Sequence, residues 1–107
     1  MEDIVMAQML NNDNFNTSIE SGVCVVDFFA TWCGPCKMLA PVFEELSGEM
    51  DEVNFFKVDV DQALDVARRY AITTVPTMII FKDGEVVDKM VGFLPKEHIK
   101  AKIEAQF

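Results

Sequence analysis

Basic residues and long apolar runs are scarce in this chain of 107 residues. Lysine and arginine together number 9 against 18 acidic residues, which gives a formal net charge of -9 at pH 7. Because nucleic acids and anionic membranes are bound by clustered lysine and arginine, neither is expected as a partner. No apolar run approaches membrane-spanning length, and the acidic start Met1-Glu2-Asp3 does not resemble a secretory signal. We therefore expect a cytoplasmic protein.

Cysteine and histidine, the ligands most typical of structural zinc sites, are also few, since the chain has three cysteines and one histidine. An odd number of cysteines in a chain without a secretory signal disfavours a static disulfide framework and favours a catalytic or metal-binding role. Zinc requires about four ligands. We expect Cys24 to be a buried core cysteine and His98 to be solvated, which leaves only Cys33 and Cys36. A zinc site within one chain is not expected, although one shared between two chains stays open.

Half of the residues are hydrophobic, which is enough for a single domain spanning residues 1–107. The expected strands are Ile4–Ala7, Val23–Ala30, Val53–Val60, Thr77–Phe81 and Val86–Val91. The expected helices are Asn11–Ile19, one from Gly34 with a kink at Pro41, one capped by Asp61 and carrying Leu64 to Tyr70, and one from Pro95 with Ile99, Ile103 and Phe107 on a single stripe.

The order of these elements indicates the fold class. Asp83-Gly84 lies between the last two apolar runs, which predicts a hairpin and hence an antiparallel pair of strands. The preceding strands alternate with helices, as in parallel units. We therefore predict an α/β fold in which a mixed five-stranded sheet, in the order βαβαβαββα, is flanked by helices on both faces.

Two cysteines separated by two residues lie in the stretch Trp32-Cys33-Gly34-Pro35-Cys36-Lys37, after an apolar strand and at the start of a helix. This arrangement is typical of a redox motif whose thiols close into a reversible disulfide. At the helix amino terminus, free amides and the helix dipole would stabilise a Cys33 thiolate, so Cys33 is the predicted nucleophile. Cys36 is expected to lie deeper, to keep its proton and to be the resolving thiol. Gly34 and Pro35 suit a stiff first turn.

Asp27 is the single carboxylate in the apolar run Val23–Ala30. A buried carboxylate is costly unless it is paired, protonated or functional. We predict that Asp27 accepts the proton of Cys36, while a satisfied core aspartate or a misplaced strand end are the alternatives. Lys57 is the candidate cation, since alternation places it on the opposite strand face from Phe56. An exposed strand lysine is the alternative for Lys57.

The sequence resembles the thioredoxin family over essentially its whole length. The matching segments are Trp32-Cys33-Gly34-Pro35-Cys36-Lys37, Val26-Asp27-Phe28, Lys57 with Val58-Asp59-Val60-Asp61, Val75-Pro76-Thr77, Phe81-Lys82-Asp83-Gly84 and Gly92. The resemblance implies the thioredoxin fold and a thiol-disulfide oxidoreductase that reduces disulfides in target proteins and maintains cytoplasmic redox homeostasis. It implies electrons from NADPH through a thioredoxin reductase and no bound cofactor, and the chain has no glycine-rich phosphate loop after a strand. A monomer is expected.

The resemblance also assigns further site residues. Pro76 would be the family's cis-proline facing the disulfide, and the backbone of Val75 would pair with an extended segment of the substrate. An apolar contact surface around Cys33 would consist of Trp32, Val60, Val75, Gly92 and Phe93. Two positions depart from the family pattern. Phe29 stands where many members carry a second tryptophan, and Phe93 follows Gly92 where a small residue is common.

Two other classes of function share this motif. A disulfide oxidase or isomerase of an oxidising compartment has the same fold, but such relatives generally carry histidine between the cysteines together with a targeting segment. A metal module or a binding scaffold would be non-catalytic. The Gly34-Pro35 pair and the acidic balance of the chain favour the reductase.

Overall fold

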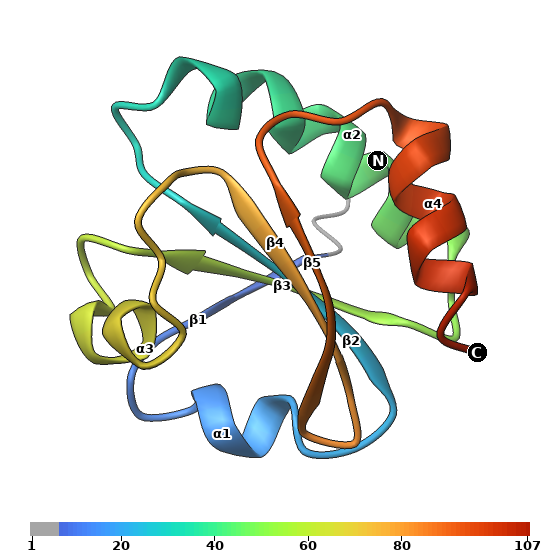
Figure 1. Ribbon diagram of the computed structural model, residues 1–107, viewed down its shortest axis with the longest axis horizontal. Helices are drawn as coiled ribbons and strands as arrows, with labels where there is room; N and C mark the ends of the chain where they lie inside the picture. Colours follow the sequence, from blue (N-terminus) through green and yellow to red (C-terminus); the bar gives the residue numbers. More distant parts are fainter. Residues whose placement is uncertain (1–6) are drawn as a thin grey trace, which may run out of the picture.

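Five strands and four helices are present in the computed structural model, which describes residues 7–107 (Figure 1). The strands are β1 (Gln8–Leu10), β2 (Val23–Phe29), β3 (Asn54–Asp59), β4 (Thr77–Lys82) and β5 (Glu85–Val91). The helices are α1 (Phe15–Ser18), α2 (Gly34–Glu49), α3 (Leu64–Arg69) and α4 (Lys96–Glu104). Their order along the chain confirms the predicted βαβαβαββα arrangement.

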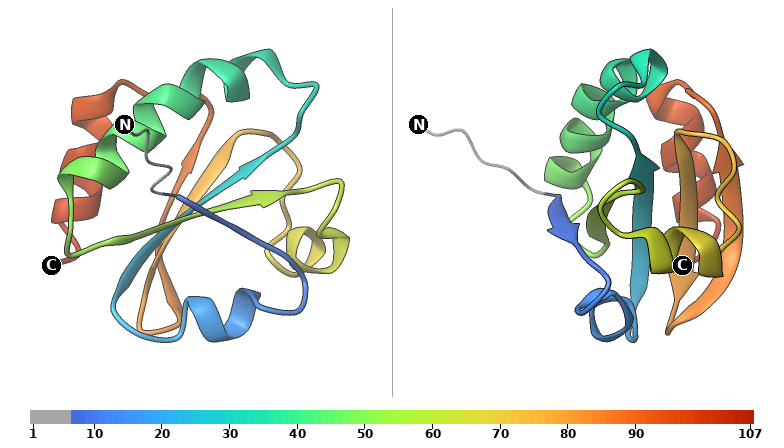
Figure 2. Two further views of the ribbon diagram at one scale, coloured as in Figure 1. Left: turned by 180° about the vertical axis from the view of Figure 1, so that it is seen from behind. Right: turned by 90° about the vertical axis from the view of Figure 1, so that its left-hand side faces the viewer.

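The strands form one mixed sheet in the order β1-β3-β2-β4-β5. Strands β1, β3 and β2 are parallel, whereas β4 is antiparallel to both β2 and β5. Successive residues of β2 point to opposite faces, so that Val25 packs with α2 and α4 while Val26 packs with α1 and α3. Helices therefore cover both faces of the sheet, as predicted, and the two layers are visible in Figure 2.

The turn between β4 and β5 is formed by Asp83 and Gly84. Their φ angles of 50° and 86° lie in the left-handed region that a two-residue hairpin turn of the favoured kind requires at both positions. The carboxylate of Asp83 also accepts a hydrogen bond of 2.8 Å from the amide of Gly22, just before β2. The hairpin is thus confirmed, and its turn is joined to the central strand.

Helix α1 is much shorter than the predicted helix Asn11–Ile19. The Asn11 side-chain oxygen accepts hydrogen bonds from the amides of Asp13 and Asn14, at 2.8 and 3.0 Å. Asparagine side chains that bind nearby amides stabilise turns at the expense of helix. The polar residues therefore form a turn, and helix begins only at Phe15.

The N-terminal strand prediction is untested, whereas the prediction for the C-terminal end is wrong. The expected strand Ile4–Ala7 lies largely outside the described residues, and the first described strand begins at Gln8. At the other end α4 stops at Glu104, and the side chain of Phe107 is 57% exposed. The predicted apolar stripe therefore ends at Ile103, because no helical turn remains to direct Phe107 toward the sheet.

Helix α3 is not capped by Asp61, so that prediction was wrong. The helix starts at Leu64, and the Asp61 carboxylate instead accepts a 2.9 Å hydrogen bond from the indole nitrogen of Trp32. An amide in the first turn of α3, that of Val66, donates to the side-chain oxygen of Asn12 at 3.2 Å. A residue distant in sequence thus satisfies a helix amide that lacks a partner within the helix.

Replacing Asn12 with alanine is expected to lower the free energy of unfolding by about 1 kcal/mol, as for loss of a helix-capping side chain. The Val66 amide would lose its acceptor. Urea denaturation of the variant and of Asp13→Ala, a change at an exposed neighbour in the same turn, would check this. Equal stability of the two variants would show that the Asn12 contact contributes nothing.

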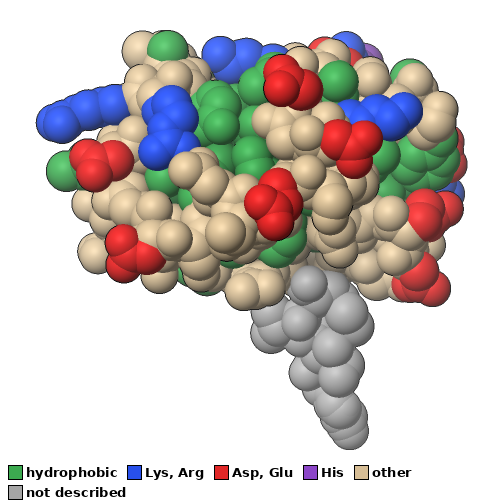
Figure 3. All heavy atoms as spheres, turned by 90° about the horizontal axis from the view of Figure 1, so that it is seen from below, with side chains coloured by type: hydrophobic (Ala, Val, Ile, Leu, Met, Phe, Trp, Pro, Cys, Tyr) green, Lys and Arg blue, Asp and Glu red, His purple; other side chains and the backbone are tan. Residues whose placement is uncertain are grey.

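One face of the molecule carries its acidic side chains in a dispersed pattern. On the face shown in Figure 3, Asp and Glu are spread over the view, and Lys and Arg stand in separate groups without forming one basic patch. Within residues 7–107, no helix combines the length and the apolar character needed to cross a membrane.

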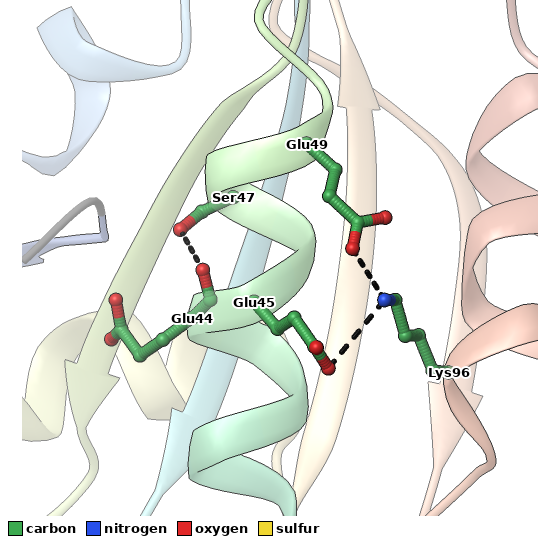
Figure 4. Close-up of polar contacts among 5 residues, drawn as sticks. All are labelled: Glu44, Glu45, Ser47, Glu49 and Lys96. Atoms are coloured by element: carbon green, nitrogen blue, oxygen red, sulfur yellow. Dashed lines mark hydrogen bonds and ion pairs between the residues drawn. The ribbon is translucent and has the colours of Figure 1, made fainter.

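Helix α2 continues past Pro41 to Glu49, and its far end is joined to α4. Lys96, at the start of α4, binds Glu45 at 3.5 Å and also binds Glu49 (Figure 4). The hydrogen bond to Glu49 is the main cause that raises the pKa of Lys96. The amino end of the same helix lies at the opposite end, where it meets the candidate site.

Candidate active site

A disulfide joins Cys33 and Cys36 at the amino end of α2, with 5.2 Å between their Cα atoms. Cys33 is the N-cap residue, and Gly34 and Pro35 form the start of the helix. The backbone amide of Cys36 donates to the Cys33 sulfur at 3.1 Å. The predicted placement of Cys33 at a helix amino terminus is therefore confirmed, and a thiolate there would receive a hydrogen bond and the positive end of the dipole.

Burial does not distinguish the two cysteines. Each is 4% exposed, so the prediction that Cys36 lies deeper was wrong. The two cysteines belong to one apolar cluster, which is covered by Phe29, Val60 and Val75. This shared cover explains why the cysteines are equally buried. The cysteines differ instead in what they contact. The Cys33 sulfur lies 3.6 Å from the Val75 carbonyl oxygen, whereas Cys36 lines a cavity that also contains Asp27.

Asp27 is 1% exposed, as expected for a carboxylate in the central strand. Its Oδ1 atom has no hydrogen-bond partner among the described residues, which argues against a satisfied core aspartate. Burial raises the pKa of Asp27 from 3.8 to about 7, while Lys57 lowers it and Glu44 raises it further. Asp27 shares a cavity of about 210 Å³ with Cys36 and Lys57. A proton could thus be exchanged with this carboxyl group near neutral pH.

Lys57 is paired in register with Asp27 on the neighbouring parallel strand. Its ammonium group lies 3.6 Å from the Glu44 carboxylate and 5.3 Å from the centre of the Phe29 ring. The side chain is only 21% exposed, so the alternative of an exposed strand lysine is wrong. Within the described residues, the ion pair of Lys57 is formed with Glu44 and not with Asp27.

Glu44 was missed by the sequence analysis. Residues Cys36, Ala40 and Glu44 follow one another at intervals of four along α2, and side chains at that spacing share one face of a helix. The same face carries Cys36 toward Asp27, so the spacing alone could have pointed to Glu44. An acidic residue on a long helix is a weak indication of a functional site, however, because most such residues are solvated.

The predicted contact residues differ in how far they are buried. Val60 and Val75 are partly buried against it. Trp32 is 69% exposed, with its indole held by Asp61, and Phe93 is 40% exposed. An exposed tryptophan directly before a redox-active cysteine is typical of a surface that binds a partner.

The peptide bond between Val75 and Pro76 is cis, as the resemblance implied. The carbonyl oxygen of Pro76 accepts a 2.8 Å hydrogen bond from the amide of Gly92, whose φ of +88° favours glycine. Segments far apart in the chain are thereby brought to one place: the start of α2, the bond before β4 and the turn after β5.

Two residues outside the site behave as expected. Cys24 is a free, fully buried cysteine, and burial is the main cause that raises its pKa. His98 is exposed near the start of α4. Across residues 7–107, no three His, Cys, Asp or Glu side chains are gathered in a way that could hold a metal ion.

The chain is similar to known proteins in both sequence and structure. The family model described as Thioredoxin matches residues 6–105. A thioredoxin from Staphylococcus saprophyticus is 53% identical over 96 residues, which cover 89% of this chain and 92% of that protein. One from Staphylococcus epidermidis is 54% identical over 91 residues, covering 84% and 88%. The crystal structure of thioredoxin from Malassezia sympodialis has a TM-score of 0.84 and 37% identity, covering 98% of this chain and 94% of that one.

Proposed function

Because this chain belongs to the thioredoxin family and is a thiol-disulfide oxidoreductase, we propose that Cys33 is its attacking thiolate and Cys36 its resolving thiol. The fold is the thioredoxin fold, and the activity is that of a protein-disulfide reductase with a redox-active dithiol. The assignment of roles rests on one observation. The Cys33 sulfur is at the helix N-cap, where it accepts a hydrogen bond from the Cys36 amide.

The reaction proceeds in two exchanges. The Cys33 thiolate attacks one sulfur of a target disulfide, forms a mixed disulfide and releases the other target sulfur as a thiolate, which takes a proton from solvent. Cys36 then loses its proton and attacks the Cys33 sulfur. The bond between Cys33 and Cys36 forms, the mixed disulfide breaks, and the second target thiolate leaves. Two electrons have passed from the dithiol to the target.

Asp27 is the proposed acceptor of the Cys36 proton. Both side chains line one cavity, and Oδ1 of Asp27 is unpartnered. With its pKa raised to about 7, Asp27 is a far stronger base than an ordinary carboxylate. Lys57, also in this cavity, is the proposed cation of the site, since it moderates the pKa of Asp27.

Targets are proposed to bind on the surface around Cys33. The proposed residues are Trp32, Gly34, Pro35, Val60, Val75, Pro76, Gly92 and Phe93. Backbone pairing with Val75 would position the target disulfide near Cys33, since the Val75 carbonyl lies 3.6 Å from that sulfur. A Cβ atom placed on Gly34 or Gly92 would meet no atom within 4 Å, which supports an open surface there.

Thioredoxins need no bound cofactor, and disulfide-containing proteins are the targets that membership of this family suggests. The source of electrons is a further part of the proposal: a thioredoxin reductase that draws on NADPH reduces the Cys33-Cys36 disulfide after each turnover. We propose that the protein acts in the cytoplasm, because a dithiol that donates electrons must be kept reduced, as thiols are in the cytosol. A monomer that forms a single domain is also part of the proposal.

The reduction potential of the Cys33/Cys36 pair tests this function. Equilibration in graded dithiol buffers, followed by counting free thiols, is expected to give a value of about -270 mV, the figure typical of thioredoxins. A value near about -120 mV would identify an oxidant instead. Failure to form any intramolecular disulfide would remove the enzymatic function altogether.

A further inference from the structure

The carboxylate of Glu44 is held beside Lys57, the register partner of Asp27 on the neighbouring strand. Its Oε2 atom lies 3.6 Å from the Lys57 ammonium group, and its Oε1 atom accepts a 3.2 Å hydrogen bond from the amide of Ala7. The Glu44 side chain is 31% exposed and that of Lys57 is 21% exposed. Both oxygens are therefore held in a partly buried setting, where solvent screens charges less than at the open surface.

Glu44 lies on the side of α2 that faces the cavity lined by Asp27, Cys36 and Lys57. Cys36 and Ala40 line that cavity, and Glu44 follows one turn later. Glu45 and Glu49 point from α2 toward Lys96, while the Glu44 side chain points to the other side of the helix (Figure 4). The neighbouring glutamates thus serve different partners, which makes Glu45 a natural control for Glu44.

The Lys57 ammonium group lies beside Glu44. Asp27 and Lys57 are register partners on adjacent strands and line the same cavity, so an ion pair between them would be expected. Lys57 is instead bound to Glu44 and placed over the Phe29 ring, and Oδ1 of Asp27 has no partner. Glu44 competes with Asp27 for the cation.

We propose that Glu44 is a positioning residue for the reaction: its carboxylate holds the Lys57 ammonium group away from Asp27, so that Asp27 remains a strong enough base to take the proton of Cys36. This inference rests on the proposed role of Asp27. Glu44 is not among the residues that line the cavity with Cys36 and Asp27. It acts through Lys57 and through its own negative charge.

The electrostatic effects on Asp27 agree in sign. Burial is the largest cause of its raised pKa, Lys57 opposes the shift, and Glu44 adds to it. Lys37 is the other charged group that lines the cavity, and the residue opposite Asp27 on β4 is the uncharged Met78. Removing the Glu44 charge would eliminate a repulsion and release Lys57 toward Asp27. Both changes lower the pKa of Asp27 and weaken it as a base.

The test compares Glu44→Gln, Glu44→Asp and Glu45→Gln with the wild-type protein. Carbon NMR of the Asp27 carboxyl group against pH is expected to show titration at least about half a pH unit lower in Glu44→Gln. Glu44→Asp keeps the charge and should stay closer to wild type, while Glu45→Gln should match it. The rate of mixed-disulfide resolution, measured with a labelled peptide disulfide, should shift along the pH axis in the same direction.

A second comparison separates the two proposals. If Asp27→Asn leaves the resolution rate and its pH profile unchanged, the proton-acceptor role of Asp27 fails. If Asp27→Asn slows resolution but Glu44→Gln shifts neither the titration nor the rate profile, only the role of Glu44 is refuted. An equal shift in Glu45→Gln would refute it as well. Should Glu44→Gln fold poorly, two other variants decide. Lys57→Met must raise the pH at which Asp27 titrates, and Glu44→Asp must titrate close to the wild-type protein. Failure of either result overturns the inference.

Discussion

Replacing Cys33 with serine is expected to lower the rate of protein-disulfide reduction by at least about 1,000-fold, because the nucleophile is lost. A serine hydroxyl stays protonated where a thiol at a helix amino terminus ionises, and it cannot form the mixed disulfide through which the reaction passes. The hydrogen bond from the Cys36 amide would have no thiolate to stabilise. Reduction of insulin in the presence of a dithiol, followed by turbidity, measures the loss.

Two matched variants make this result specific. Cys36→Ser should still attack a target disulfide but should then accumulate the mixed disulfide, visible as a mass increase that a reductant reverses. Cys24→Ser alters a buried free cysteine outside the site and should keep most of the activity. If Cys36→Ser abolished attack while Cys33→Ser retained it, the two proposed roles would have to be exchanged.

Replacing Asp27 with asparagine is expected to stabilise the protein strongly at alkaline pH. The pKa of Asp27 is about 7 in the folded protein and near the ordinary 3.8 when unfolded. As pH rises from about 4 to about 7, the unfolded chain loses this proton while the folded protein keeps it, so the wild type loses stability across that window. At about 1.4 kcal/mol for each pH unit, the complete loss above pH 7 is on the order of 4 kcal/mol.

Asparagine carries no charge at any of these pH values and so avoids the loss. Urea denaturation of the oxidised wild type and variant at pH 4 and pH 8.5 would measure this loss. The difference in free energy of unfolding in favour of Asp27→Asn should grow by up to about 4 kcal/mol from pH 4 to pH 8.5. A difference of the same size at both pH values would mean that the pKa of Asp27 is not raised by folding. The variant should also resolve mixed disulfides more slowly, so the gain in stability accompanies a loss of function.

Much of the fold follows from local sequence. The apolar run of β2 predicts a strand covered on both faces, and the structure places Val25 and Val26 in the two opposite core layers. Asp83-Gly84 predicts its hairpin because few other pairs adopt positive φ at two successive positions. Cys33 follows a strand and precedes a helix, which suffices to predict its place at the helix amino terminus. These features depend on neighbours within a few residues.

Two of the differences share a physical cause, which is competition among polar groups distant in sequence. Asp61 was expected to cap α3 but binds the indole of Trp32, while Asn12, far away in the chain, accepts the helix amide. The partner of Lys57 is decided in the same way. Both Asp27 and Glu44 are acidic, and nothing local indicates which one the ammonium group binds.

The sequence by itself therefore determined the order of strands and helices, the two core faces and the redox pair. Only the tertiary structure decided which charges and hydrogen-bonding groups surround that pair. Backbone propensity and apolar periodicity act over a few residues, whereas the electrostatic environment of Asp27 depends on where α2 and β3 bring Glu44 and Lys57. The equal burial of the two cysteines has the same origin, because the side chains that cover them come from β2 and from the segments after β3 and α3.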